Sequence, residues 1–144
     1  MNVEELQAEW EKDSILNPTE LSSESLRIPQ LHAKYLREHT NARLLLRKHE
    51  KDFREVYQIM HDYYSGVLTP EQLRAIGRNP YPKTVLRADV RDHAEADPKV
   101  EEIRLKIEYQ KEKVLMLEKI LDSVSKRGYQ IKNAIDWQRF MAGS

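Results

Sequence analysis

The feature that most constrains this chain is a run of apolar residues spaced three and four apart between Gln30 and Gly66. Residues at that spacing share one face of an α-helix, whereas a strand would place them alternately on opposite faces. The run therefore predicts a single helix of about ten turns. Its apolar stripe comprises Leu31, Tyr35, Ala42, Leu45, Leu46, Phe53, Val56, Ile59, Met60 and Tyr63.

Positive charge gathers on the same predicted helix, off the apolar stripe. Residues 27–54 hold eight Lys or Arg against three acids, and residues 1–24 hold seven acids and one lysine, within a chain of zero formal net charge. Such segregation permits contact with a polyanion despite the neutral total. The alternative is the solvated exterior of a helical bundle. The cations that we consider for phosphate contact here are Arg43, Arg47, Lys48, Lys51 and Arg54.

Start and stop signals divide the first two thirds of the chain. Residues 1–16 contain a short acidic amphipathic helix, and Asn17-Pro18 resembles an N-cap with a first-turn proline for a long basic helix over 17–66. Pro29 either kinks or restarts that helix. Residues 67–97 read as a loop with one short helix at 70–76, and their last part, from Lys83 to Asp97, reads as a loop or a frayed segment.

A second long helix is predicted over 98–127, with Asp97 as its N-cap. Gly128 is expected to interrupt it, so that residues 128–144 form a separate C-terminal oligomerisation tail. Because apolar residues lie on several sides of this second helix, it needs more than one partner, and self-association would supply it. The residues predicted to join subunits are Val114, Leu117, Leu121, Ile131, Ile135, Trp137 and Phe140.

Several classes of function are unsupported by the residues present. The chain has no cysteine, no signal peptide and no apolar run of membrane-spanning length, so we expect a soluble intracellular protein without a membrane partner. No two of its five histidines are four residues apart. His61-Asp62 is accompanied by neither a nucleophile elbow nor a glycine-rich phosphate loop. We therefore expect no metal, no cofactor and no enzymatic activity.

Short strings in a fixed order run almost the whole length of the chain. The clearest is Asp62-Tyr63-Tyr64-Ser65-Gly66; it is followed by Lys83-Thr84-Val85-Leu86 and then by Arg127-Gly128. In this order the strings resemble the recombination mediator proteins of T-even-type bacteriophages, the UvsY family. The resemblance extends from Glu4 near the start to Ala142-Gly143 at the end.

The resemblance implies an all-α protein: a single helical domain over residues 1–144, built as a long helical hairpin with short N-terminal and C-terminal helices. Protomers of this family assemble into a ring-like or open-barrel homo-oligomer, from hexamer to heptamer, that binds single-stranded DNA in the cytoplasm of the infected bacterial host. The family protein destabilises the phage single-strand-binding protein on that DNA and promotes loading of a RecA-like recombinase. The alternative is a helical scaffold or adaptor that bridges only protein partners.

One departure from the family affects the DNA site. The family carries basic residues just before the Asp-Tyr-Tyr string, and this chain has Gln58 and Met60 there. The DNA surface is therefore expected either around Lys51, Arg54 and the loop cations, or nearer the C-terminus. Tyr63 is expected to close the apolar stripe, whereas Tyr64 either stacks on bases or packs at the helix end. These further DNA candidates are His61, Tyr64, Lys83, Arg87, Lys126, Arg127 and Lys132.

Overall fold

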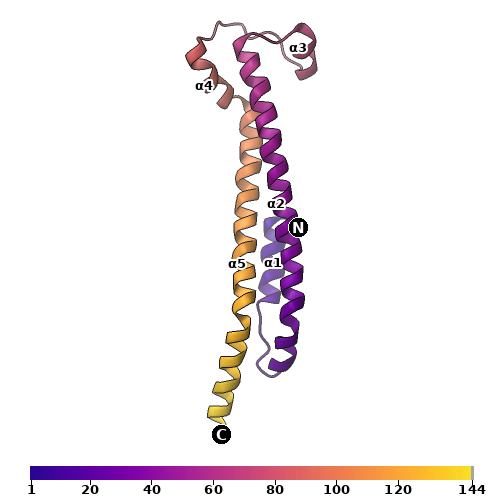
Figure 1. The fold of residues 1–144 in the computed structure, drawn as a ribbon, viewed down its shortest axis with the longest axis vertical. Helices are drawn as coiled ribbons and strands as arrows, with labels where there is room; N and C mark the ends of the chain where they lie inside the picture. Colours follow the sequence, from indigo (N-terminus) through magenta and orange to yellow (C-terminus); the bar gives the residue numbers. More distant parts are fainter. Residues whose placement is uncertain (144) are drawn as a thin grey trace. The chain divides into compact units, whose positions relative to one another are not determined.

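The computed structural model describes residues 1–143, and every regular element among them is helical, as the sequence predicts. The chain packs as two compact units that share the two long helices: unit 1 is Met1–Leu44 with Lys111–Ser144, and unit 2 is Leu45–Gln110. Within the described part of the chain, no helix has both the length and the hydropathy to cross a bilayer. The elements are α1 (Val3–Asp13), α2 (Leu21–Ser65), α3 (Pro70–Ile76), a 3₁₀ turn (Arg87–Asp89), α4 (Val90–Glu95) and α5 (Pro98–Met141) (Figure 1).

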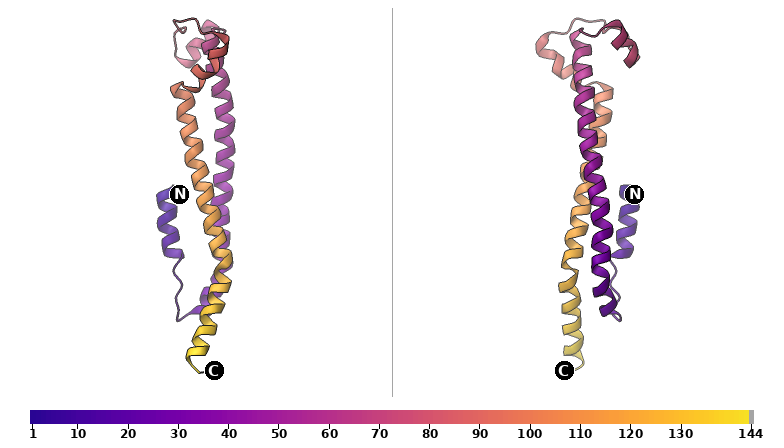
Figure 2. Two further views of the ribbon diagram at one scale, coloured as in Figure 1. Left: turned by 90° about the vertical axis from the view of Figure 1, so that its left-hand side faces the viewer. Right: turned by 45° about the vertical axis from the view of Figure 1, so that its right-hand side comes forward.

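Unit 1 is built from α1, the first part of α2 and the last part of α5. The right-hand view in Figure 2 shows α1 beside that part of α2. Leu6 of α1 is completely buried, and the Trp10 ring meets the Tyr35 ring edge to face at 5.4 Å between centroids. The same core contains Leu31 of α2 and Leu117 of α5. The acidic helix is therefore held by an apolar face as well as by charge.

Helix α1 begins at a capping box. The side chain of Asn2 accepts a hydrogen bond from the backbone N–H of Glu5, and the Glu5 carboxylate accepts one from the backbone N–H of Asn2. These two bonds satisfy donors that the first turn leaves free. The predicted helix within residues 1–16 is confirmed.

Unit 2 is organised by helix caps around a small core. Thr69 and Gln72 form a capping box for α3, which ends at Gly77 with a left-handed φ of 67°. Gly66 has a φ of 74°, and its N–H donates to the Tyr63 carbonyl, as expected where α2 stops. Asp97 caps α5, because its carboxylate accepts from the backbone N–H of Lys99 at 2.9 Å. The caps at residues 69–70, 77 and 97–98 confirm the sequence prediction.

Both long helices continue through the residues at which the sequence suggested an interruption. Helix α2 runs through Pro29 without restarting, so the restart alternative is excluded. Pro29 is exposed to solvent, so water can reach the carbonyl that the proline leaves without a donor. Helix α5 runs through Gly128 to Met141, so the prediction of a separate C-terminal helix was wrong. A glycine inside a helix costs only about 1 kcal/mol. The buried side chains of Val124 and Ile131 on either side favour a continuous helix.

Two further boundaries differ from the sequence prediction. Asn17 and Pro18 do not begin α2, which starts at Leu21; instead the Asn17 carboxamide oxygen accepts from the backbone N–H of Thr19 at 3.0 Å and closes a turn. Part of the segment predicted as a loop from Lys83 to Asp97 is helical, because it contains the 3₁₀ turn and α4. Val90 and Ala94 of α4 are buried in unit 2. A helix this short has too few residues to reveal its period in the sequence.

Candidate nucleic-acid interface

Three exposed cations line one face of α2 in unit 2. Arg47, Lys51 and Arg54 are spaced four and three apart, which places them on one side of the helix; we call them the α2 basic stripe. Among residues 1–143, no carboxylate lies within ion-pair distance of Arg47 or Arg54. Lys51 lies 3.8 Å from Glu55, and both side chains are more than half exposed. An exposed pair of this kind contributes well under 1 kcal/mol, so the stripe remains available to an anion.

The stripe leads along α2 to a hollow that contains two of the predicted DNA residues. His61 follows Arg54 by seven residues and therefore lies on the same helix face. The 3₁₀ turn brings Arg87 to the same hollow, which has a volume of about 460 Å³ and is also lined by Ser65, Val85 and Val90. The structure thus joins His61 and Arg87, which are far apart in the sequence. Lys83 is exposed in the segment that precedes the turn.

The two positions where the family carries basic residues are occupied differently here. The Met60 side chain is 3% exposed and belongs to the core of unit 2, where it packs with Ala94 and Val100. Gln58 is exposed, and its carboxamide donates to Asp62 at 3.0 Å. A cation at position 60 would be buried away from a ligand. The cationic surface of unit 2 is therefore formed by the stripe and the hollow.

Tyr64 is held in a polar cluster inside unit 2. Its hydroxyl donates to Asp97 at 2.7 Å, and its ring meets that of Tyr81 at 4.9 Å. Burial, together with the hydrogen bond to Asp97, raises the pKa of Tyr64 to about 12. Tyr63 is 8% exposed and closes the apolar stripe as predicted. The structure thus favours the packing alternative for Tyr64 over base stacking.

Asp97 is the centre of this cluster. Asp97 is 1% exposed. Both terminal nitrogens of the Arg78 guanidinium donate to its carboxylate, one of them at 2.9 Å. Burial alone would raise the pKa of Asp97, but the hydrogen bonds from Arg78 and Tyr64 hold it below its usual value. The residue therefore caps α5 and ties it to the chain that follows α3. The capping role was visible in the sequence; the ion pair was not.

Arg127 is not available to DNA in this structure. It is 3% exposed, and its guanidinium donates to the Glu24 carboxylate at 3.0 Å and to the Ile15 carbonyl at 3.2 Å. The prediction that Arg127 contacts DNA was therefore wrong, because this side chain is buried in unit 1 and neutralises the Glu24 carboxylate there. The other candidates in unit 1 are exposed, namely Arg43, Lys126 and Lys132, and Lys48 is exposed in unit 2.

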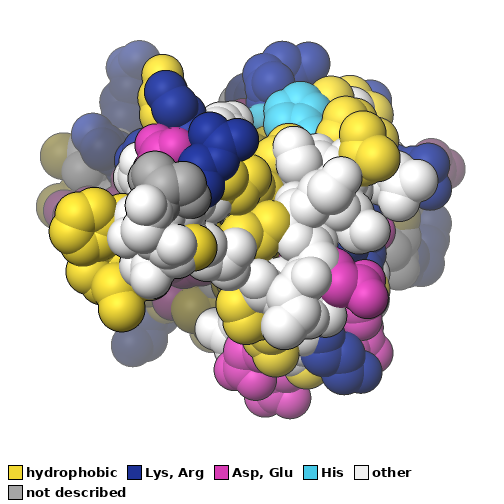
Figure 3. Space-filling model, turned by 90° about the horizontal axis from the view of Figure 1, so that it is seen from below, with side chains coloured by type: hydrophobic (Ala, Val, Ile, Leu, Met, Phe, Trp, Pro, Cys, Tyr) yellow, Lys and Arg dark blue, Asp and Glu magenta, His cyan; other side chains and the backbone are white. Residues whose placement is uncertain are grey.

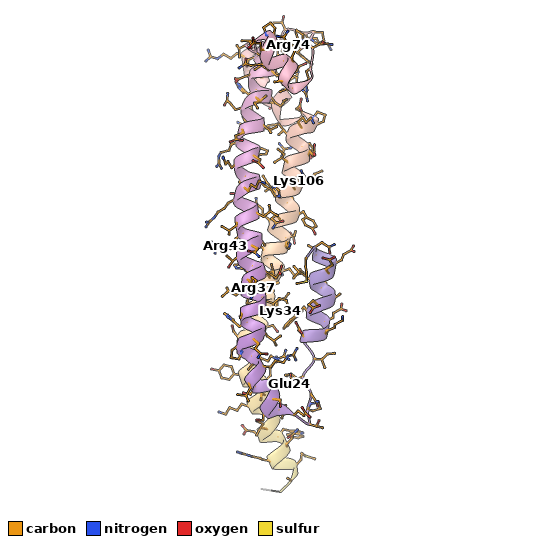
Figure 4. The ribbon with its side chains drawn as sticks, turned by 90° about the vertical axis from the view of Figure 1, so that its right-hand side faces the viewer. Glu24, Lys34, Arg37, Arg43, Arg74 and Lys106 are labelled. Carbon is orange, nitrogen blue, oxygen red and sulfur yellow. The ribbon has the colours of Figure 1, made fainter. Side chains whose placement is uncertain are left out.

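Acidic side chains of α1 form ion pairs with two of the cations of residues 27–54. Lys34 lies 2.6 Å from both Glu9 and Asp13, and Arg27 lies 2.9 Å from Asp13. In Figure 4, Lys34 lies on the side of α2 that faces α1, and Arg43 lies on the other side. Burial alone would raise the pKa of Asp13, but the hydrogen bonds from Lys34 and Tyr35 lower it. The opposite charges of residues 1–24 and 27–54 were the signal for this contact.

The residues predicted to join subunits divide into two groups. Leu117 and Ile131 are buried within the chain, with exposures of 0% and 3%, so they serve the core of one protomer and were wrong as interface residues. Trp137 and Phe140 are 62% and 69% exposed and stack on each other at 5.6 Å. Figure 3 views the end of the molecule that carries the C-terminus and shows hydrophobic and basic side chains sharing its surface. Val114, Leu121 and Ile135 are partly buried.

The described residues provide no site for a metal. No group of three or more His, Asp or Glu side chains within residues 1–143 is placed to hold an ion. Beside the hollow, the structure offers a ligand exposed cations and exposed aromatic rings. A flexible polyanion with unpaired bases can use both kinds of group.

Comparison with known proteins finds relatives that match almost the whole chain. The sequence is 25% identical over 143 residues to the recombination protein uvsY of Enterobacteria phage T4, covering 99% of both chains. Two crystal structures of the bacteriophage T4 recombination mediator protein UvsY match the fold at 24% identity. One has a TM-score of 0.84 and covers 99% of this chain and 98% of that chain; the other has a TM-score of 0.85 and covers 97% and 99%.

The family described as "Recombination, repair and ssDNA binding protein UvsY" matches residues 9–144, which is nearly the whole chain. This confirms the resemblance carried by the short strings. The chain belongs to the UvsY family of recombination, repair and single-stranded-DNA-binding proteins.

Proposed function

We propose that this protein is a non-catalytic recombination mediator that binds single-stranded DNA as a homo-oligomer in the cytoplasm of a phage-infected bacterium. On that DNA it destabilises the single-strand-binding protein and promotes loading of a RecA-like recombinase. Membership of the UvsY family supports the recombination role, and the curated relative is a phage protein. The observation that carries the DNA-binding part is the α2 basic stripe with the His61–Arg87 hollow at its end.

The stripe suits phosphates rather than bases. Its two arginines and one lysine are exposed and present positive charge to solvent, so the interaction is electrostatic and independent of sequence. Arg87 and His61 extend the cationic surface beyond the stripe. Exposed Arg43 and Lys48 on α2, and Lys83 before the 3₁₀ turn, add charge that a flexible strand can reach.

One protomer offers only a modest number of phosphate contacts. Linked copies in an assembly convert later contacts into intramolecular ones and raise the apparent affinity without any new kind of contact. The stacked pair of Trp137 and Phe140 is the apolar surface that we assign to subunit contact, with Ile135, Leu121 and Val114 beside it on α5. A ring-like or open-barrel arrangement, from hexamer to heptamer, would present many stripes to one strand.

Such an assembly gives the mediator role a physical basis. Many weak cationic contacts along one strand compete with the single-strand-binding protein for the same phosphates, and contacts to phosphates leave most of the bases accessible to a recombinase. Each contact is easily exchanged, so the strand can be handed over. The second candidate is a scaffold that bridges only proteins. The exposed pair of Trp137 and Phe140 supports it, but it does not explain the α2 basic stripe.

The test is the salt dependence of single-strand binding. Lys51→Ala combined with Arg54→Ala should weaken binding to all single-stranded sequences alike. It should also flatten the slope of log affinity against log salt, by roughly 0.7 for each phosphate that the variant no longer neutralises. Fluorescence anisotropy with labelled oligo-dT and with a mixed sequence measures both effects.

The matched control is Arg74→Ala with Lys119→Ala, two exposed cations on α3 and α5 rather than on α2. It should leave the slope close to that of the wild type. An unchanged slope in the stripe variant would show that those residues do not meet phosphates. No oligo-dT binding by the wild-type assembly would favour the scaffold.

A further inference from the structure

Tyr129 is the most exposed aromatic side chain among the described residues. It is 75% exposed on α5. Within residues 1–143, no hydrogen bond, ring contact or cation–π contact involves it. A large apolar ring left in water on a rigid helix, without packing, invites a ligand with a flat apolar face.

Two lysines flank this ring. Lys126 and Lys132 lie three residues before and after Tyr129, so the three side chains share one side of α5. The two lysine backbones are about 9 Å apart along the helix axis. Flexible lysine side chains over that span can hold phosphates on both sides of one nucleotide.

Both lysines are free to serve in this way. Lys126 pairs with Asp122 at 2.8 Å, but both groups are about two-thirds exposed, so the pair is easily exchanged. No described carboxylate lies within ion-pair distance of Lys132. A Cβ added at Gly128, the residue before Tyr129, would meet no atom within 4 Å outside its own stretch of helix, so no other segment of the chain covers α5 at that position.

A nucleic acid fits this surface better than a second copy of the chain. The cores of protein interfaces are depleted in lysine, whereas single-strand sites combine cations with an aromatic platform. The other aromatic candidates are less suitable: the Tyr64 hydroxyl is bonded to Asp97, and Trp137 and Phe140 stack on each other.

We propose that the ring of Tyr129 stacks on one unpaired base of the single strand, while Lys126 and Lys132 hold the phosphates next to it. This subsite rests on the proposed DNA-binding function. It adds a stacking interaction that requires a base, whereas the stripe requires only the charge of the phosphates. It takes any nucleotide, because every base has a π-face.

The experiment compares an oligo-dT strand with an abasic strand of the same length and the same phosphate charge. Tyr129→Ala should lose about tenfold in affinity for oligo-dT, within the range that one base–aromatic stack provides, with an unchanged salt slope. Tyr129→Phe keeps the π-face and should bind like the wild type. On the abasic strand all three proteins should bind equally.

Tyr109→Ala, which removes another exposed tyrosine on α5, is the matched control and should leave both affinities unchanged. Light scattering on each variant should give the wild-type mass. The stacking proposal is overturned by unchanged oligo-dT affinity in Tyr129→Ala, by an equal loss on the abasic strand, or by a loss that accompanies a lower mass. Failure of the wild type to bind either strand would instead overturn the proposed function.

Discussion

Arg127→Met should lower the free energy of unfolding by about 3 kcal/mol, because it leaves the buried Glu24 carboxylate without its main partner. Glu24 has a side-chain exposure of 12%, and Arg127 has one of 3%. The effect should lie at the lower end of the range for broken buried pairs, since Arg27 remains 3.5 Å from Glu24. Urea unfolding at a fixed protein concentration measures it, because assembly makes stability depend on concentration.

Two companion variants make this result interpretable. Lys126→Met changes the neighbouring exposed cation and should shift the free energy of unfolding by no more than about 0.5 kcal/mol. Adding Glu24→Leu to Arg127→Met removes the stranded charge and should recover much of the loss. A urea midpoint for Arg127→Met equal to that of the wild type would show that the pair does not support unit 1.

Asp97→Ala should destabilise unit 2 by about 3 to 5 kcal/mol, because it strands Arg78 and the Tyr64 hydroxyl and removes the cap of α5. The Asp97 side chain has no exposed surface, and that of Arg78 is 23% exposed. Asp97→Asn should cost less, since asparagine still caps a helix. Asp92→Ala, on the exposed side of α4, is the control and should stay within about 0.5 kcal/mol of the wild type.

The Asp97 effect should also depend on pH. The folded protein holds the pKa of Asp97 below its usual value, so the carboxylate contributes stability that is complete above the unfolded pKa of about 3.9. That contribution is lost as the pH falls through the lower folded-state pKa. The difference in unfolding free energy between the wild type and Asp97→Asn should therefore shrink in acid. A difference that is constant from neutral pH to below pH 3 would contradict the ionic role.

The sequence predicted the elements whose signals are local. The caps at Thr69 and Asp97 and the stop at Gly66 depend on residues within one turn of the helix end, and all three are where they were expected. Gly128 misled for the opposite reason. A glycine inside a helix costs only about 1 kcal/mol, and the packing of the side chains around it is set by partners far along the chain. A proline costs about 3 kcal/mol, so its local signal at Pro29 left both a kink and a restart open, and the structure excludes the restart.

The same distinction between local signals and distant partners applies to the residues of the candidate site. Exposed Arg47, Lys51 and Arg54 follow from helix periodicity, because residues off an apolar stripe face solvent. The fate of Arg127 does not, since its partner Glu24 is more than a hundred residues away. Tyr129 passed unnoticed because a single exposed aromatic has no pattern; only the empty surroundings of its ring single it out.

The central claim is that many modest cationic surfaces, joined through the C-terminal end of α5, hold one flexible strand together. Trp137→Ser with Phe140→Ser tests it most directly, with light scattering and oligo-dT anisotropy on the same sample. We expect the mass to fall toward that of a monomer or dimer and the affinity for oligo-dT to fall with it by about a hundredfold, because the binding sites are no longer linked. A protomer of reduced mass that holds oligo-dT as tightly as the wild type would contradict it.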